Sequence, residues 1–264
     1  MKILGFIGMG NMGQAMLNGC LNLFSGEMLT FTDVSEKCCQ LIKEKTGVDY
    51  VSNAVECVNS VKYVVLAIKP QVYPVILEQI RDLVSPEQIV ISIAPSYSIQ
   101  QLKDALGQYV RVVRAMPNTP AMVGEGMSGV CFSDDIFTDG EKEFVRNFFT
   151  SFGKMEEVPE HLINAVTVAS GSSPAFVYMF IEALADSAVK YGMPRDKAYT
   201  FAAQAVMGSA KMVLETGEHP GRLKDNVCSP GGTTIEGVAV LEAKGMRSAV
   251  IEAASAVYDK CNRM

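Results

Sequence analysis

The sequence predicts an α/β protein in two parts, an N-terminal, mostly parallel, doubly wound sheet and a C-terminal domain built only from helices. Strand-like and helical segments alternate from the N-terminus to residue 158, which is typical of a sheet assembled from β-α-β units. After Pro159 the sequence contains helical patterns and no strand candidates. We therefore expect one domain at residues 1–159 and a second at residues 160–264.

The composition excludes several classes of protein. The chain has 264 residues, 48% of them hydrophobic and 20% charged, which predicts a sizeable core and argues against disorder. The net charge is −6 and no block of Lys and Arg occurs, so we expect neither nucleic acid nor an acidic membrane surface as a partner. Seven cysteines without C-x-x-C spacing indicate reduced thiols in a cytoplasmic protein. With two histidines and no carboxylate–histidine cluster, we expect no metal site. No apolar run is long enough to span a membrane, and the apolar N-terminus is too short for a signal peptide.

The elements of the first domain follow from hydrophobic periodicity. Apolar segments predict strands at residues 2–7, 28–32, 50–51, 62–68, 89–93, 110–114, 126–132 and 154–158. The fourth of these is continuously apolar, as expected of a strand buried on both faces. Amphipathic segments predict helices from residue 12 onward and at residues 36–46, 73–84, 99–106 and 139–151. Gly47 and Gly107 mark the ends of two of these helices.

The first strand runs directly into the sequence Gly8-Met9-Gly10-Asn11-Met12-Gly13. A helical pattern follows, so strand, glycine turn and helix occur in the order of a Rossmann-like dinucleotide-binding unit. Gly8 permits the tight turn, Gly10 lets a pyrophosphate approach the backbone, and Gly13 lets the helix pack on the strand. A G-x-G-x-x-G pattern alone is a weak indication, and its place between strand and helix supports the nucleotide hypothesis here.

Asp33 ends the second strand, about 20 residues after the glycines, where an acidic side chain accepts hydrogen bonds from the adenosine ribose. The alternative is a helix N-cap, since Glu36 follows three residues later. No arginine follows directly, and a 2′-phosphate would meet the like charge of Asp33 with only Lys37 near to offset it. Asp33 therefore favours NADH over NADPH.

Further candidates follow the ends of later strands. Because the carboxyl ends of parallel strands face the ligand crevice, Ala67, Ile68 and Lys69 should border the cofactor. For Lys69 the alternative is a solvated loop lysine. The proline-rich segment at residues 115–120 suits a rigid lip of the same crevice.

The second domain begins with a helix at residues 160–169, which we expect to break at residues 170–174, with Pro174 starting the next helix. That helix extends to Tyr191 and is apolar on nearly all sides, so most of its surface must be buried. A domain of this size can hardly bury it within one chain. A partner subunit is the expected cover. Helices at residues 194–216 and 246–261 follow, with a short turn from Pro220 to Asn226 between them.

Between that turn and the last helix lies the segment Ser229-Pro230-Gly231-Gly232-Thr233-Thr234. Thr233 and Glu236 fit a capping box, so a helix should start near Thr233. The N–H groups of the glycine turn and the helix start form an anion site, with the hydroxyls of Ser229 and Thr234 beside it. We interpret this as a pocket for a small carboxylate whose reacting end lies near a hydroxyl. The alternative is a plain glycine loop before a capped helix.

The sequence contains few of the side-chain groups that commonly carry catalysis. The sequence shows no Ser-His-Asp set, no metal cluster and no evident acid–base carboxylate pair. Hydride transfer to an already electrophilic carbon, such as a protonated imine, needs none of these, because a nicotinamide carries the chemistry.

Several segments together resemble the pyrroline-5-carboxylate reductases, and the resemblance covers essentially the whole chain. They are Gly5–Gly13, Ala67–Pro70, Met116–Pro120, Ser170–Ala175 and Leu223–Thr234, the last of which is highly specific to that family. The resemblance implies a Rossmann domain followed by a helical dimerisation domain, and reduction of 1-pyrroline-5-carboxylate to proline with NADH or NADPH. It also implies a homodimer or a higher oligomer such as a ring of dimers.

By the same resemblance, the substrate carboxylate and imine would be bound by Ser229, Gly231, Gly232, Thr233 and Thr234, with Thr234 as the catalytic residue near the ring nitrogen. Cofactor contacts would come from the glycine turn, with Asn11 and Met12, and from Asn53, Ala67, Lys69, Pro70 and Asn226. Two positions depart from the family pattern. Ser173 stands where glycine is frequent, and Asp33 stands where members that prefer NADPH keep a small polar or basic group.

The sequence is also compared with the patterns of two other functions. The β-hydroxyacid dehydrogenases have an opening fingerprint similar to Gly5–Gly13, but they carry a catalytic lysine on a helix after a glycine-rich motif in the second domain. Here no lysine follows Ser173 until Lys190. A nucleotide-binding regulatory or structural oligomer would not need the pocket at Gly231–Thr234.

Overall fold

The computed structural model describes residues 2–263 and divides the chain into two compact units. The first unit extends to Ser172 and takes in the chain again from Val257, and the second is Ser173–Ala256. This division falls later than residue 159, because the start of the helical region packs on the sheet. Gly129 of the sheet lies against Val166, and Ile163 is fully buried in the same core. The functional boundary after residue 159 stays a prediction.

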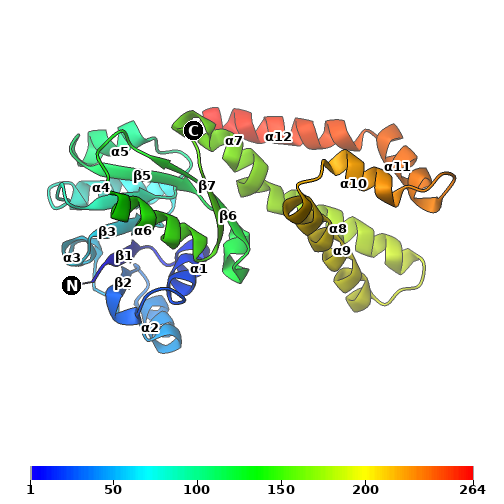
Figure 1. The fold of residues 1–264 in the computed structure, drawn as a ribbon. Coiled ribbons are helices and arrows are strands. Elements are labelled where there is room, and N and C mark those ends of the chain that lie inside the picture. Colours follow the sequence, from blue (N-terminus) through cyan, green and yellow to red (C-terminus); the bar gives the residue numbers. More distant parts are fainter. Residues whose placement is uncertain (1, 264) are drawn as a thin grey trace. The chain divides into compact units, whose positions relative to one another are not determined.

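The first unit contains a seven-stranded sheet in the order β2-β1-β3-β4-β5-β6-β7 (Figure 1). All neighbours are parallel except β5 and β6. Four strands, β1 to β4, are buried along their whole length, as expected of a sheet covered on both faces. The strands are β1 Leu4–Ile7, β2 Leu29–Thr32, β3 Tyr63–Leu66, β4 Ile89–Ser92, β5 Arg111–Met116, β6 Gly126–Phe132 and β7 Gly153–Glu157.

Helices cover both faces of this sheet, which confirms the predicted doubly wound fold. Residues of α1, α2 and α6 form one buried cluster with the sheet, and residues of α3, α4, α5 and α7 form the other. The helices are α1 Asn11–Cys20, α2 Glu36–Thr46, α3 Ala54–Ser60, α4 Tyr73–Ile80, α5 Ile99–Leu106, α6 Asp139–Thr150 and α7 Ile163–Val166. Short 3-10 turns occur at η1 Gly26–Met28, η2 Pro70–Val72, η3 Thr119–Val123 and η4 Glu160–Leu162. As predicted, Gly47 ends α2 in the left-handed conformation, and Gly107 follows α5 at a φ of +119°.

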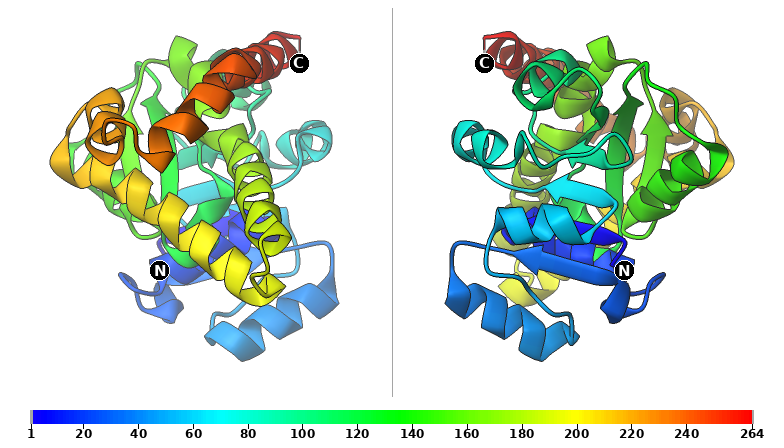
Figure 2. Two further views of the ribbon diagram at one scale, coloured as in Figure 1. Left: turned by 90° about the vertical axis from the view of Figure 1, so that its right-hand side faces the viewer. Right: turned by 90° about the vertical axis from the view of Figure 1, so that its left-hand side faces the viewer.

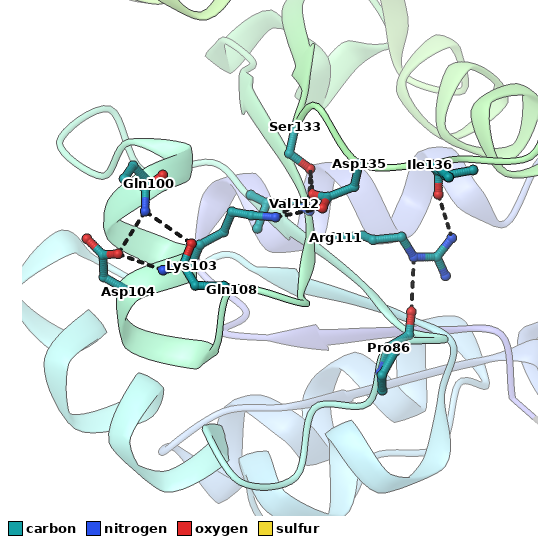
Figure 3. Close-up of polar contacts among 10 residues, drawn as sticks. All are labelled: Pro86, Gln100, Lys103, Asp104, Gln108, Arg111, Val112, Ser133, Asp135 and Ile136. Atoms are coloured by element: carbon teal, nitrogen blue, oxygen red, sulfur yellow. Dashed lines mark hydrogen bonds and ion pairs between the residues drawn. The ribbon is translucent and has the colours of Figure 1, made fainter.

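Hydrogen bonds and an ion pair connect the loop after β6 with α5 and β5 (Figure 3). Lys103 of α5 contacts both oxygens of Asp135, at 2.7 and 2.6 Å, and the Ser133 hydroxyl donates to the same carboxylate. Ser133 in turn accepts from the Val112 N–H. Burial alone would raise the pKa of Asp135, but the contacts with Lys103 and Ser133 outweigh it and lower the pKa. The carboxylate is therefore charged at neutral pH and holds this loop in place.

A second ion-paired carboxylate, Glu141, is buried at the start of α6. Its side chain is 6% exposed and contacts Lys62 Nζ at 2.8 Å and Arg111 Nη1 at 2.7 Å. It also closes a capping box with Thr138. Burial alone would raise the pKa of Glu141, but the hydrogen bonds from Lys62, Thr138 and Arg111 reverse the direction and lower the pKa to about 2. This ion-paired carboxylate stabilises the first unit at neutral pH.

The second unit consists of helices α8 Ser173–Lys190, α9 Arg195–Thr216, α10 Pro220–Val227, α11 Thr233–Ala243 and most of α12 Met246–Asn262. Helices α8 and α9 run side by side, as the views in Figure 2 show. Their contact buries only the small side chains of Ala185, Ala198 and Ala202. Large apolar side chains of the same helices, Met179, Phe201 and Leu214 among them, remain exposed. The second unit therefore has only a small core of its own among the described residues.

Several predicted elements differ from the structure. The strand at residues 50–51 is only an isolated bridge between Phe31 and Tyr50. Helix α3 was not predicted from the sequence. The predicted turn after Pro220 is the helix α10, which His219 caps by accepting from the Gly221 N–H. The predicted helix starts at Thr233, but the capping box is wrong, because Gly232 is the N-cap residue and no side chain caps this helix.

The predicted break at residues 170–174 is also wrong. A π-helical turn, Thr167–Ser172, leads directly into α8, so a continuous helix runs from Glu160 to Lys190. Proline has no N–H and its ring crowds the carbonyl four residues earlier. The wider π-helical turn before Pro174 accommodates both effects without ending the helix.

This continuous helix is long and apolar enough to cross a membrane by length and composition alone. No such segment was predicted, because the sequence around Pro174 divides the helix into two shorter patterns. Core helices of soluble proteins also meet this criterion, so the observation is weak evidence for a membrane.

Candidate active site

The three glycines of the turn after β1 differ in their surroundings: two are tightly packed and one faces open space. Gly8 has a φ of +98°, and a Cβ there would lie 2.7 Å from the Ala67 carbonyl oxygen. A Cβ at Gly13 would overlap the Gly8 carbonyl. Around Gly10, by contrast, no atom lies within 4 Å of where a Cβ would be. Gly10 is the N-cap residue of α1 and leaves the first N–H groups of that helix without a side-chain cap. Gly8 and Gly13 thus serve packing, and Gly10 gives an anion access to the helix N-terminus.

A groove of about 490 Å³ lies at the carboxyl ends of β1, β2 and β3. Strand order reverses here, since β1 lies between β2 and β3, and such switch points are where α/β sheets bind ligands. Five predicted cofactor residues, in addition to Gly8, contribute to the lining: Gly10, Asp33, Asn53, Ala67 and Lys69. The first unit therefore brings these predicted residues together in one groove.

The Asp33 carboxylate is hydrogen-bonded to the backbone of the glycine turn. Its Oδ2 accepts from the Met9 N–H at 2.8 Å, and its Oδ1 accepts from the Ser35 N–H at 2.9 Å. The cap of α2 is Ser35, whose hydroxyl accepts from the Cys38 N–H, so the alternative of Asp33 as N-cap is wrong. A carboxylate has about four acceptor positions, which leaves Asp33 free to accept further hydrogen bonds at the groove.

The other predicted cofactor residues have varied surroundings. Asn53 is exposed and caps α3, its Oδ1 accepting from the Glu56 N–H at 2.9 Å. Lys69 is exposed and precedes the turn that Pro70 begins. Asn11 is the exposed first residue of α1, whereas Met12 is partly buried against the core.

One wall of the groove consists of residues that were not predicted from the sequence. It is apolar and is formed by Val34, Val72, Val75 and Ile76. Val34 is fully exposed at 101%, which is unusual for valine. Its position directly after Asp33 was the available signal in the sequence. An exposed apolar wall of this kind suits the flat face of an adenine or nicotinamide ring.

The predicted substrate residues lie together in the second unit, in the loop between α10 and α11. Gly231 has a φ of +67°, and a Cβ at Gly232 would overlap the Ser229 hydroxyl. The Gly232 N–H donates to the Ser229 carbonyl at 3.0 Å, which closes the turn. Thr233 and Thr234 are the first two residues of α11, and both are exposed. Asn226 lies in the last turn of α10.

This loop can bind a small anion through backbone groups. The first turn of α11 has no side-chain cap, so its N–H groups point outward at the positive end of the helix dipole. Thr234 contributes a hydroxyl at the same helix end, and it caps nothing. The sequence was compatible with a threonine as the helix cap, and the structure shows that neither threonine has this role.

An apolar cavity of about 560 Å³ lies elsewhere in the second unit, between α10, α11 and α12. Its lining includes Val238, Leu241, Met246, Val250 and Ile251, with charged groups at the rim. Within residues 2–263 no group of three or more His, Cys, Asp or Glu residues could hold a metal ion.

Comparison with known proteins identifies both parts of the chain. Residues 160–264 match the family model "Pyrroline-5-carboxylate reductase dimerisation", and residues 3–96 match "NADP oxidoreductase coenzyme F420-dependent". The chain is 47% identical to a pyrroline-5-carboxylate reductase of Escherichia coli K12, over 100% of this chain and 98% of that protein. It is 41% identical to the Methanosarcina acetivorans enzyme, over 95% and 93% of the two chains.

Solved structures agree with these sequence relatives. A Plasmodium falciparum pyrroline carboxylate reductase with NADP bound is 33% identical, with a TM-score of 0.89 over 98% of this chain and 97% of that one. A pyrroline-5-carboxylate reductase from Coxiella burnetii is 30% identical, with a TM-score of 0.91 over 99% and 98% of the two chains.

Proposed function

The chain belongs to the pyrroline-5-carboxylate reductase family, and from this premise we propose that it reduces the imine carbon of 1-pyrroline-5-carboxylate with NADH or NADPH to give L-proline, the final step of proline biosynthesis. The observation that carries the proposal is the 47% identity over the whole chain. Both the glycine turn and the loop before α11 fall within that match, so the proposal rests on both parts of the chain.

The first unit fits a dinucleotide. Bound in the groove, the cofactor would supply the hydride, and the chain supplies binding and orientation. The backbone of Gly8, Gly10, Asn11 and Gly13 would hold the pyrophosphate at the start of α1. The apolar wall with Val34 excludes water from the rings, while Lys69 offers a charge-assisted hydrogen bond at the groove.

Asp33 supports a preference for NADH. Its carboxylate is fixed by the N–H groups of Met9 and Ser35, so it cannot turn away from an incoming ribose without losing both bonds. Free acceptor positions suit the ribose hydroxyls, and the negative charge opposes a 2′-phosphate. The Plasmodium falciparum relative binds NADP, and we propose that this chain differs from it in preferring NADH.

The second unit supplies the substrate contacts. The N–H groups at Gly231, Gly232 and Thr233 would bind the carboxylate, and Ser229 would support the turn. Thr234 would lie near the ring nitrogen, which changes from iminium toward amine as the hydride arrives. A hydroxyl can donate or accept, so Thr234 follows this change without carrying a charge. Asn226, in the preceding helix, would contact the cofactor.

The protein is a homo-oligomer with a small-molecule substrate, as the family's dimerisation model over residues 160–264 indicates. We propose a dimer that can assemble further into a ring of dimers. The second unit supports this proposal, because large apolar side chains on α8, α9, α11 and α12 are exposed in one chain. A second copy would cover them, which also accounts for the apolar helix without a membrane. We further propose a cytoplasmic enzyme that binds no nucleic acid, consistent with its net charge of −6.

A spectrophotometric assay with 1-pyrroline-5-carboxylate and either cofactor tests the function. We expect oxidation of NADH that depends on the imine and yields proline. A β-hydroxyacid with NAD⁺, assayed beside it, should give no turnover. Absence of imine-dependent oxidation with both cofactors would refute the proposal.

A further inference from the structure

The β4–α5 loop, residues 93–98, lies at the same edge of the sheet as the dinucleotide groove. Strands β3 and β4 are parallel, with Leu66 opposite Ser92, so both strands end at this edge. Ala67 and Lys69, which follow β3, line the groove. The β4–α5 loop follows the neighbouring strand, so it is the next segment along the edge.

The order of the strands indicates which end of a dinucleotide would reach this loop. In the proposed binding mode the adenosine ribose meets Asp33, which follows β2, and the pyrophosphate meets the glycine turn, which follows β1. The nicotinamide lies on the other side of the pyrophosphate. Because the sheet continues from β1 to β3 and β4, the nicotinamide end would extend toward the β4–α5 loop.

Tyr73 connects the start of the loop with the end of β3. Its side chain is fully buried at the start of α4. The Tyr73 hydroxyl donates to the Leu66 carbonyl at 2.9 Å, so it accepts from the Ser92 hydroxyl, also at 2.9 Å. Ser92 in turn accepts from the Ala94 N–H at 3.4 Å. The Tyr73 ring stacks on Tyr97 with the centroids 4.5 Å apart, so the loop is packed against α4.

Arg114 of β5 holds the loop from the opposite side. It is almost fully buried, and its Nη2 donates to the Pro95 carbonyl at 2.6 Å. Its Nη1 donates to Glu160 Oε1 at 2.9 Å. The same oxygen of Glu160 accepts from the Ile99 N–H at 2.7 Å, where α5 begins. One ion pair therefore anchors the loop at two points, the carbonyl of Pro95 and the start of α5.

The same strand carries a second arginine with a similar arrangement at the other end of β4 (Figure 3). Arg111 is paired with Glu141 at 2.7 Å. It also donates to the carbonyls of Pro86 and Glu87, which precede β4. The Arg111 side chain is 14% exposed and that of Arg114 is 9% exposed. The two arginines thus hold opposite ends of β4, and Arg114 acts at the carboxyl end.

We propose that Arg114, through its pair with Glu160, is a positioning residue for the nicotinamide ring of the cofactor. The pair holds the β4–α5 loop in place before the cofactor binds, which removes the cost of ordering the loop on binding. It also determines how accurately the ring is placed for hydride transfer. The inference rests on the proposed reductase function and concerns residues of the first unit alone.

Two substitutions of Arg114 test this role. Arg114→Met removes all the donors, keeps the length of the side chain and leaves no charge buried on the strand. The Glu160 side chain is 33% exposed, so water can solvate the carboxylate that loses its partner. Arg114→Lys keeps the charge for Glu160 but lacks the planar fork that bonds two acceptors at once. The matched controls are Arg111→Met and Arg111→Lys, which make the same changes at the other end of β4.

Calorimetry measures the binding of NADH and of ADP-ribose, which lacks the nicotinamide ring. For Arg114→Met we expect the Kd for NADH to rise about 2- to 10-fold, because the loop must then be ordered on binding. The Kd for ADP-ribose should stay unchanged. Arg114→Lys should change the Kd for NADH in the same direction by a smaller factor, and it decides by the same criteria if Arg114→Met does not fold. The Arg111 variants should melt at a lower temperature and bind both ligands as the wild type does.

Three results would overturn the proposal: unchanged NADH binding in the Arg114 variants, equal weakening of NADH and ADP-ribose, or the same loss of NADH affinity in the Arg111 variants. Each of them would assign to Arg114 a structural role without a specific effect on the nicotinamide ring.

Steady-state kinetics with 1-pyrroline-5-carboxylate give a second readout. We expect kcat of Arg114→Met to fall by about 10- to 100-fold, the cost of misplacing a reacting group by roughly an ångström, and kcat of Arg111→Met to be retained. A wild-type kcat in Arg114→Met would contradict the role in hydride transfer. If the wild-type protein did not reduce this imine, the proposed function would fail, whereas the comparison of NADH with ADP-ribose would still decide whether Arg114 positions the ring.

Discussion

Replacing Thr234 with alanine removes a single hydroxyl from the helix start at the substrate loop. Loss of a preorganised hydrogen bond that forms in the transition state costs about 2.7–4 kcal/mol in a dry site, and less where the group is more exposed. Thr234 is exposed within one chain. We therefore expect kcat to fall by roughly 10- to 1,000-fold, with NADH binding nearly unchanged.

The structure separates this effect from a loss of stability. Gly232 is the N-cap residue of α11, and no side chain caps this helix. A threonine cap would contribute about 1 kcal/mol to stability, but Thr234 makes no such contribution. The free energy of unfolding of Thr234→Ala should therefore stay within about 0.5 kcal/mol of the wild-type value.

Steady-state kinetics and a thermal melt on the same sample measure both quantities. Thr234→Ser, which keeps the hydroxyl and loses the methyl group, is the control and should recover most of the lost activity. A Thr234→Ala protein that melts at a lower temperature but turns over at the wild-type rate would refute the catalytic role and leave only a structural one.

The remaining predictions concern cofactor choice, assembly and pH. Asp33→Ser should shift the ratio of kcat/KM values toward NADPH, and a clear NADPH preference in the wild type would contradict the role given to Asp33. Light scattering at micromolar concentration should show at least a dimer; a stable, active monomer would be incompatible with the exposed apolar faces of the second unit. Glu141→Gln should lower the free energy of unfolding at neutral pH by on the order of 3 kcal/mol, since the pKa falls from its usual 4.5 to about 2 in the folded protein. The lowered pKa means that Glu141 stabilises the folded state above about pH 4.5 and loses this contribution as the pH falls toward about 2. Denaturant unfolding at neutral pH and near pH 3 should thus show a smaller difference between wild type and Glu141→Gln at the acidic pH, and an equal difference at both would refute the assignment.

Local patterns predicted much of the first unit. Strand, glycine turn and helix follow one another in the sequence, so the roles of Gly8 and Gly13 depend on neighbours only a few residues away. The ends of α2 and α5 were predicted because glycine follows both helices. Helix α3 was missed, although Asn53 and Glu56 have the spacing of a cap and the residue that it contacts. Its seven residues show too little periodicity to stand out.

Contacts between distant segments explain the errors. Asp33 lies in the groove where the cofactor contact was predicted, but its bond to the Met9 N–H was not predicted, because it joins residues 24 positions apart and follows no local rule. The sequence around Pro174 looks like a helix end, and the helix continues because Asn118 and the packing of Gly171 support a π-helical turn. Thr233 and Glu236 have the spacing of a capping box, but the helix begins one residue too early for it, at the glycine before Thr233.

The transfer of hydride to the imine carbon is tested most directly by following the label. The protein is incubated with 1-pyrroline-5-carboxylate and NADH that carries deuterium at both positions of C4, and the product is analysed by mass spectrometry and NMR. We predict L-proline with one deuterium on the ring carbon that was double-bonded to nitrogen, and the same product from Thr234→Ala at a rate about 10- to 1,000-fold lower. Unlabelled proline, label at another carbon, or no proline at all would contradict the account.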